Sequence, residues 1–137
     1  VGKGLSYDKL RDAETKSLLR QAGALASSHD VPVIYAGDFN STVNSNHVVD
    51  APAIAMRAAR INDAQLAAQT LSNARYNSSN QYVRTPPAFG QSIDYVFAPP
   101  GIGVRSRSLI IRQTHGKFVG VMPSDHNPIQ AELTFPY

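Results

Sequence analysis

Two segments of the sequence place carboxylate and amide side chains at the end of an apolar run or inside one. Asp38 and Asn40 follow the apolar run 31–36, and the period of an extended chain puts both side chains on the same side. Asp94 lies inside the short apolar run 92–97. Burying an ionised carboxylate is costly unless it is paired or hydrogen-bonded. Asp94 therefore needs a partner such as a histidine, a metal ion or an arginine.

A third segment, 123–128, joins an acidic residue directly to a histidine. Pro128 favours an extended conformation of Asn127, so we expect Asp125 and His126 in a stiff turn that opens into a strand. Adjacent Asp and His side chains can serve in hydrogen bonding, metal binding or acid–base chemistry. Each of the three segments, taken alone, also fits an ordinary polar turn or strand end.

These segments fall between elements that the hydrophobic pattern predicts as alternating helices and strands. In chain order the pattern predicts a loop over 1–9, a helix from Leu10 to the polar residues 27–30, a strand over 31–36 buried on both faces, a helix after the cap residue Asp50, a short helix over 64–71, a long loop over 72–91, and strands over 92–97, 104–112 and 129–135. A helix that leads into a doubly buried strand indicates an α/β fold. Loops as long as the predicted one are often functional.

Composition limits the protein classes without naming a function. The chain has 137 residues, of which 42% are hydrophobic and 17% charged, so we expect one globular domain or part of a larger one. The absence of cysteine excludes disulfides, thiolate zinc sites and cysteine nucleophiles. No apolar run reaches the length of a membrane span. The net charge of +3 is too small to indicate a nucleic-acid-binding patch by itself. The first residue is Val1 rather than Met, which favours a fragment or a processed product.

Taken in order, the segments GDFNS, SIDYVF and PSDHNPI resemble the motifs of the endonuclease/exonuclease/phosphatase superfamily, which includes DNase I and the exonuclease III type of abasic endonuclease. The resemblance runs from about Leu10 to Tyr137. Proteins of that superfamily pack two similar β-sheet halves around the active site. The resemblance therefore implies that residues 1–137 are the C-terminal portion of such a domain, without its N-terminal half. The expected fold is α/β: one half of a DNase I-like four-layer sandwich, with a mixed β-sheet and helices on one face.

The resemblance also implies a role for each motif residue. Asp38 would orient or deprotonate the attacking water, and Asn40 would contact the phosphate. Asp94 would hydrogen-bond His126 and fix its tautomer, as a carboxylate does in a hydrolytic triad. His126 would contact the scissile phosphate. Asp125 and Asp38 would hold a divalent metal ion, for which oxygen ligands favour Mg²⁺ first and Mn²⁺ second.

The implied activity is a metal-dependent phosphoesterase, with DNA, RNA, a phospholipid or an inositol phosphate as open substrates. We expect weak or no activity from this chain alone, because a metal-binding Glu of the absent half is missing and Glu14 lies in a predicted helix away from the motifs. The expected partners are a phosphate-ester substrate, with nucleic acid among the candidates, and either the missing N-terminal half or a second copy that covers the exposed sheet face. The alternative is a non-catalytic binding protein or fragment that retains the fold.

Other polar residues have simpler interpretations. We expect Arg105 and Arg107, two residues apart in a predicted strand, to share a face that is solvated or, as the alternative, meets a phosphate backbone. Tyr76, Tyr82 and Arg84 in the long loop are candidates for contact with a substrate. Three asparagines of the same loop are interpreted as ordinary polar loop residues: Asn73, Asn77 and Asn80.

Overall fold

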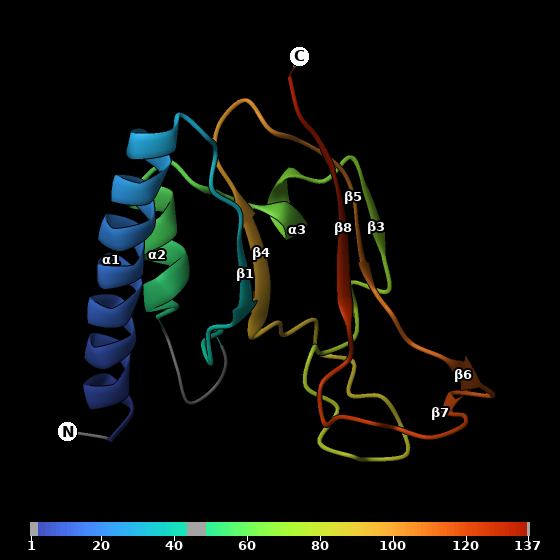
Figure 1. Ribbon diagram of the computed structural model, residues 1–137. Helices are drawn as coiled ribbons and strands as arrows, with labels where there is room; N and C mark the ends of the chain where they lie inside the picture. Colours follow the sequence, from blue (N-terminus) through green and yellow to red (C-terminus); the bar gives the residue numbers. More distant parts are fainter. Residues whose placement is uncertain (1–2, 44–48, 137) are drawn as a thin grey trace.

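The computed structural model describes residues 3–43 and 49–136 of the chain. Two helices lie along one side of a small sheet, and a second sheet lies beyond the first (Figure 1). The elements are α1 (Lys3–His29), β1 (Tyr35–Asp38), α2 (Ala51–Ala58), β2 (Asn62–Asp63), α3 (Ala64–Ala67), β3 (Thr70–Ser72), β4 (Asp94–Ala98), β5 (Gly103–Leu109), β6 (Gln113–Thr114), β7 (Lys117–Phe118) and β8 (Ile129–Thr134). The predicted α/β class is confirmed.

Within the described residues, the strands form two three-stranded sheets and one hairpin. The first sheet has the order β1-β4-β2 and is antiparallel, with Asp38 directly opposite Asp94. The second sheet has the order β3-β5-β8 and is mixed, because β3 runs parallel to β5 whereas β8 runs antiparallel to it. Strands β6 and β7 form the hairpin. The expected mixed sheet is therefore present.

The main core lies between the helices and one face of the first sheet. Tyr35, Met56, Tyr95 and Phe97 are buried together. Phe39 packs edge-on against Phe97, with ring centroids 5.3 Å apart, and the rings of Tyr95 and Phe97 stack at 5.0 Å. Successive strand residues point to opposite faces of a sheet. Because Tyr35, Tyr95 and Phe97 face this core, the side chains that alternate with them in β1 and β4 point to the other face of the sheet.

Asp50 joins α2 to this core. Its Oδ1 accepts a hydrogen bond from the Ala53 N–H at 3.2 Å, so the predicted helix cap is confirmed. Its Oδ2 accepts from the Tyr95 hydroxyl. Burial, followed by this bond to the carboxylate, raises the pKa of Tyr95 and keeps the phenol protonated as a donor. The interaction fixes the start of α2 against β4.

Four predicted elements differ from the structure. The strand predicted over 104–112 ends at Leu109 as β5. The helix α1 begins at Lys3 rather than at Leu10, because helix-forming residues precede Leu10 and a glycine near a helix end costs only about 1 kcal/mol. The strand β1 begins at Tyr35, and only Tyr35 is buried in it, so the prediction of a strand covered on both faces is wrong. The predicted helix over 64–71 ends at Ala67, because residues 70–72 pair with β5 as β3.

The long predicted loop is present, but its polar residues form a buried framework. The exposed fractions are 0% for Ser78, 2% for Asn80 and 6% for Asn127. Asn80 donates from Nδ2 to the Asn127 Oδ1 at 3.2 Å, and Asn127 donates from its backbone N–H to the Ser78 carbonyl at 2.7 Å. The interpretation of Asn80 as an ordinary polar loop residue is therefore wrong. The framework ties the loop to the turn before β8.

Among the described residues, no helix is both long and apolar enough to cross a membrane.

Ser78→Ala should lower the free energy of unfolding by about 1–3 kcal/mol. The buried Ser78 hydroxyl accepts hydrogen bonds from the backbone N–H groups of Ile93 at 2.9 Å and Asp94 at 3.3 Å, and alanine leaves both donors unpaired. Urea unfolding followed by circular dichroism measures the change. The matched control is Ser79→Ala, whose hydroxyl makes a 3.4 Å bond to the Asp125 carbonyl and which should change stability by less than about 0.5 kcal/mol. Equal losses in the two variants would contradict the buried framework.

Candidate active site

Three side chains from distant parts of the sequence meet at one end of the first sheet. Asp38 is the last residue of β1, Asp94 is the first residue of β4, and His126 lies in the turn before β8. Each offers one potential ligand atom, and these atoms all lie within 4.8 Å of one another. His126 Nδ1 is 2.8 Å from Asp94 Oδ2. The structure thus brings together three of the residues that the motifs singled out and supplies the partner expected for Asp94.

Asn40 lies beside Asp38 in a tight backbone turn. Its φ of 50° is in the left-handed region, which asparagine tolerates better than most residues. Its backbone N–H donates to Asp38 Oδ1 at 2.7 Å, and this bond orients the Asp38 carboxylate. The side chains of both residues are exposed, which leaves them accessible to a substrate.

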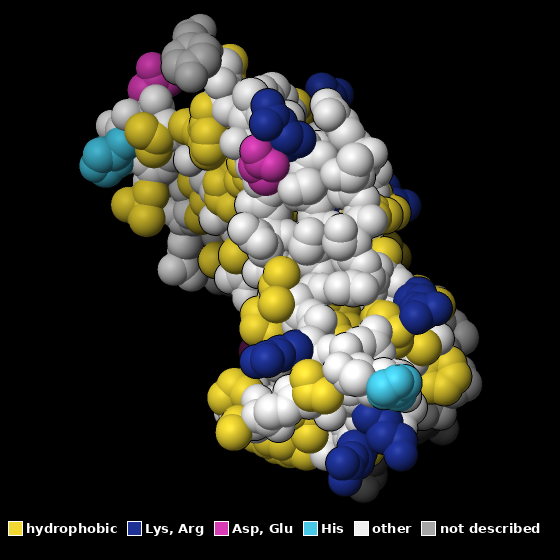
Figure 2. Space-filling view, turned by 90° about the vertical axis from the view of Figure 1, so that its right-hand side faces the viewer, with side chains coloured by type: hydrophobic (Ala, Val, Ile, Leu, Met, Phe, Trp, Pro, Cys, Tyr) yellow, Lys and Arg dark blue, Asp and Glu magenta, His cyan; other side chains and the backbone are white. Residues whose placement is uncertain are grey.

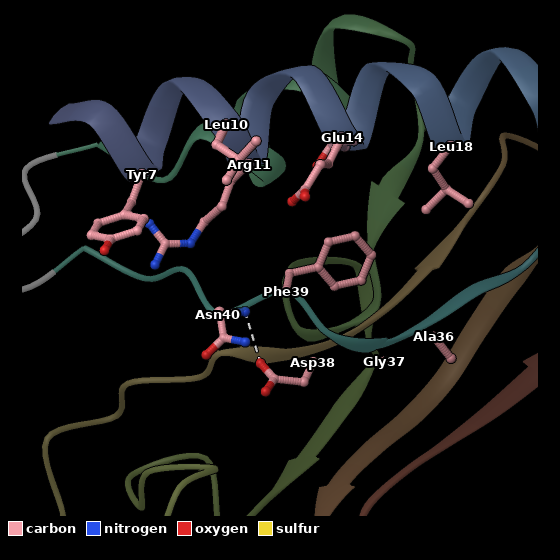
Figure 3. A pocket seen from close by; sticks show the side chains of 11 residues that line it. Tyr7, Leu10, Arg11, Glu14, Leu18, Ala36, Gly37, Asp38, Phe39 and Asn40 are labelled. Carbon is pink, nitrogen blue, oxygen red and sulfur yellow. Dashed lines mark hydrogen bonds between the residues drawn. The ribbon is translucent and has the colours of Figure 1, made fainter. Parts of the chain in front are cut away.

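A cavity of about 560 Å³ lies between α1 and the end of β1. Figure 3 shows Arg11 and Glu14 pointing from α1 into this space, above Asp38 and Asn40. The expectation that Glu14 lies away from the motifs is therefore wrong. The signal in the sequence was the apolar Phe39 between Asp38 and Asn40, which packs against the same core as Leu19 and Ala22 of α1.

The backbone of Asp94 is held from both sides. Its N–H donates to the Ser78 hydroxyl, and its carbonyl accepts from the Ser92 hydroxyl at 2.6 Å. Ser92 in turn accepts from Arg107 Nη2 at 3.0 Å. These bonds fix the strand start that presents the Asp94 carboxylate to His126.

Arg107 is only 3% exposed, so the expectation that it shares a solvated face with Arg105 is wrong. A β-bulge between Val104 and Ser106 inserts Arg105 as an extra residue, so the two arginines no longer follow a period of two. Arg105 pairs with Glu132 at 3.1 Å on the exposed side. Burial lowers the pKa of the Arg107 guanidinium, whereas the charges of Asp63 and Asp94 raise it.

Asp125 lies next to this centre but outside the group of three. Its carbonyl accepts from the backbone N–H groups of Asn80 at 2.6 Å and Gln81 at 3.2 Å, and its side chain is exposed. The following N–H, of His126, donates to the Ser124 hydroxyl at 3.0 Å. The turn is therefore stiff, as expected, and a metal-binding role for Asp125 stays a prediction.

Carboxylates dominate the electrostatics of His126. Partial burial lowers the pKa of its imidazole, but the hydrogen bond to Asp94 and the charges of Asp94, Asp38 and Asp125 raise it by more, so that the net pKa lies above the ordinary value. The side chains of His126 and Asp94 are 27% and 19% exposed, respectively. The imidazole can thus be held by Asp94 at one nitrogen while it remains reachable at the other.

The donor set fits a hard divalent cation. Asp38 and Asp94 offer carboxylate oxygens and His126 offers an imidazole nitrogen, and these atoms lie within 4.8 Å of one another. Carboxylate-rich sites of this kind suit Mg²⁺ or Mn²⁺. Each carboxylate accepts one hydrogen bond, Asp94 from His126 and Asp38 from the Asn40 N–H, but Asp38 is the more exposed of the two and therefore the more available to a metal ion.

Together, the fold and the site define an α/β protein with a carboxylate–histidine pair beside a second carboxylate. The model of the endonuclease/exonuclease/phosphatase family matches residues 2–126, and the chain belongs to this family. The family is generally hydrolytic and typically uses divalent metal ions. A search of curated protein sequences gave no significant match.

Solved structures of this family share the fold. A mannosyl-6-phosphatase from Bacteroides thetaiotaomicron superimposes with a TM-score of 0.73 at 20% identity, over 98% of this chain and 48% of that protein. An endonuclease/exonuclease/phosphatase from Bacteroides vulgatus superimposes with a TM-score of 0.72 at 24% identity, over 94% of this chain and 45% of that protein. The chain therefore spans about half the length of the structures it matches, and its fold is DNase I-like.

Asp94→Asn should lower the pKa of His126, because it removes both the hydrogen bond to the carboxylate and the nearest negative charge. A group whose pKa is raised by folding adds stability below its unfolded pKa and loses that contribution as pH rises through the folded pKa. The stability advantage of the wild type should therefore be largest below about pH 6.5 and shrink above it.

An NMR pH titration of the imidazole C–H signals, in the absence of metal ions, measures this shift. The signals of His29 and His115 are internal controls, because the structure gives neither residue a contact with Asp94. A His126 titration curve that is identical in wild type and Asp94→Asn would contradict the pairing.

Proposed function

We propose that this chain carries the active site of a divalent-metal-dependent phosphoesterase. The observation that supports the proposal most directly is the meeting of Asp38, Asp94 and His126, with the 2.8 Å bond between the last two. Pairing with His126 satisfies the Asp94 carboxylate, but folding gives no reason for the exposed Asp38 carboxylate beside this pair. Phosphate-ester hydrolysis does, because it requires an oriented water and a stabilised phosphate charge.

Each residue has a role that follows from its position. Asp38 orients the attacking water or accepts its proton, since its carboxylate is exposed and already held by the Asn40 N–H. Asp94 accepts from His126 Nδ1 and thereby fixes the tautomer and direction of the ring. The other ring nitrogen of His126 then faces the scissile phosphate and stabilises the charge that develops there. The Asn40 side chain contacts a phosphate oxygen.

Mg²⁺ is the first choice for the metal ion and Mn²⁺ the second, with Asp38 and Asp125 as ligands from this chain. A bound divalent cation neutralises phosphate charge and supports the leaving oxygen. Asp38 belongs to the group of three potential ligands, and Asp125 is exposed and directly precedes His126 in the sequence.

We propose further that a complete catalytic unit needs a second half, supplied by an N-terminal half or by a second copy. Two observations support this. The chain spans about half the length of the matching structures. The side of α1 above the candidate site also carries exposed apolar residues, namely Tyr7, Leu10 and Leu18 at 56%, 52% and 41% exposure. A role in binding without catalysis is the second candidate function, favoured by the same half-length coverage.

The two candidate functions, catalysis and binding without catalysis, predict different results in a hydrolysis assay. The catalytic unit should hydrolyse bis(p-nitrophenyl) phosphate or p-nitrophenyl phosphate in the presence of Mg²⁺ or Mn²⁺ and lose this activity in EDTA. Asp94→Asn should lower turnover by a factor on the order of 10⁴, by analogy with a triad carboxylate. Asp38→Ala should be at least as damaging.

The matched control is Asp12→Asn, because Asp12 is a carboxylate on α1 that pairs with Lys16 at 2.7 Å and takes no part in the site. This variant should keep wild-type turnover. Wild-type rates in Asp94→Asn or Asp38→Ala would refute the roles assigned to these residues. Hydrolysis that does not depend on metal would refute the requirement for a divalent cation.

A further inference from the structure

Among the described residues 3–43 and 49–136, Arg107 is the one charged side chain that is buried, at 3% exposure. The Lys and Arg side chains visible in Figure 2, which looks at the side of the molecule where the second sheet lies, reach the surface. Within the same ranges, Arg107 forms no ion pair with a carboxylate. A buried cation without a close partner is costly for folding, and an apolar side chain in the place of a buried charge is often neutral or stabilising. The burial of Arg107 therefore indicates a role besides stability.

The hydrogen bonds that begin at Arg107 lead to Asp94. A guanidinium has donors only, so Arg107 Nη2 donates to the Ser92 Oγ, at 3.0 Å. The hydroxyl hydrogen of Ser92 is then left to donate to the Asp94 carbonyl, at 2.6 Å. Ser92 is itself only 9% exposed, so water has little access to this chain of bonds. Arg107 thus fixes the direction of the Ser92 hydroxyl, which in turn holds the backbone of Asp94.

The pair formed by Asp94 and His126 spans two sheets. Asp94 opens β4 in the first sheet, and His126 lies in the turn before β8 in the second. Among the described residues, no backbone ladder joins these two sheets. The 2.8 Å separation within the pair therefore depends on loops and side chains that cross from one sheet to the other. The loop 72–91 provides one such link through Ser78.

Arg107 provides a second link, from inside the second sheet. It belongs to β5, the middle strand of that sheet, where it lies opposite Ala131 of β8. Its guanidinium reaches the segment that leads into β4 of the first sheet. Burial lowers the pKa of the Arg107 guanidinium, whereas the charges of Asp63 and Asp94 raise it. Both carboxylates belong to the first sheet, so their attraction for Arg107 adds to the hydrogen bonds that join the two sheets.

We propose that Arg107 is a positioning residue, which acts through Ser92 to hold Asp94 of the first sheet against His126 of the second. The inference deepens the proposed function and rests on it for the effect on turnover, but the effect on the pair itself does not require hydrolysis. An arginine suits this role because its charge persists when it is buried and its long side chain can reach across from β5.

The first measurement is the tautomer of the His126 imidazole, obtained from the ring ¹⁵N chemical shifts of this chain in EDTA at an alkaline pH where the ring is neutral. In the wild type, the bond to Asp94 should hold the proton on Nδ1, and this tautomer should exceed the other by about tenfold or more, as expected for a hydrogen bond to a charged group. Arg107→Met should reduce this excess by a factor of about 5, the equivalent of one hydrogen bond.

Arg107→Lys tests whether a cation with a single donor is sufficient. It keeps the charge and one donor for Ser92, and the described residues use only one guanidinium nitrogen in a hydrogen bond. This variant should therefore recover most of the wild-type tautomer excess. A tautomer excess as low as that of Arg107→Met would contradict a role for the charge and the donor.

A double-mutant cycle tests the path through Ser92. Ser92→Ala removes the hydroxyl that joins Arg107 to Asp94, so it should reduce the tautomer excess by a similar factor. Because the two side chains act as one unit, Arg107→Met should have little further effect in the Ser92→Ala background. Effects of the two substitutions that multiply independently would overturn the proposal.

Two matched controls separate positioning from net charge and from stability. Arg105→Met removes a charge from the same strand, but Arg105 is exposed and pairs with Glu132, so the tautomer ratio should stay at its wild-type value. Val104→Ala removes buried volume where β5 pairs with Leu133, near the end of β8 that is remote from the turn before this strand. It should unfold at a lower urea concentration and keep the tautomer ratio.

Arg107→Met itself should unfold at about the wild-type urea concentration, because it replaces a buried charge by an apolar side chain. An unchanged tautomer ratio in Arg107→Met, or an equal change in Val104→Ala, would overturn the proposal.

Hydrolysis of bis(p-nitrophenyl) phosphate by the catalytic unit in Mg²⁺ is the second measurement. Arg107→Met should lower kcat by roughly 10- to 100-fold, because a small displacement of a catalytic group is enough for such a loss. KM should stay within about twofold, because Arg107 acts through Asp94 and not on the substrate. In the Asp94→Asn background, Arg107→Met should lower kcat no further.

A raised KM with unchanged kcat would overturn the positioning role. Absence of metal-dependent hydrolysis in the wild type would instead refute the proposed function, and the tautomer measurement would still decide the role of Arg107.

Discussion

The candidate site depends on the hydrogen bond between Asp94 and His126. Asp94 opens a strand whose next residues are buried, so its carboxylate needs a partner that offsets the loss of water. His126 supplies it at 2.8 Å from 32 positions further along the chain. The same contact gives the imidazole its direction and raises its pKa. One interaction thus satisfies a requirement of folding and orients the imidazole to which we assign a catalytic role.

The parts around this pair hold it in place. Ser78 and Ser92 bond the N–H and the carbonyl of Asp94, and Arg107 supports Ser92 from a buried position. On the other side, Asn80 holds the turn that carries His126. Apart from the local bond between Ser92 and Asp94, these contacts join segments that are distant in sequence, which keeps the two halves of the pair from moving independently.

Local sequence patterns predicted the residues of the candidate site better than the residues that hold them in place. Asp38, Asp94 and His126 could be singled out because each interrupts or follows an apolar run, and the order of the main helices and strands followed from periodicity. The burial of Asn80 could not be predicted, because an asparagine in a loop gives the same sequence pattern whether its side chain faces water or a hydrogen-bond network. Arg107 was misplaced because a bulge changes the face of a strand without altering its sequence pattern. The start of α1 was missed because glycines read as loop residues.

We propose that Asp38, Asp94 and His126 form one catalytic centre, with a divalent metal ion held at Asp38 beside the Asp94–His126 pair. The most direct measurement is NMR line broadening by Mn²⁺ added in small amounts to the protein. The account predicts selective broadening of the His126 imidazole signals, with sharp signals from His29 and His115, and loss of this selectivity in Asp38→Asn. Equal broadening of all histidines, or unchanged selectivity in the variant, would contradict it.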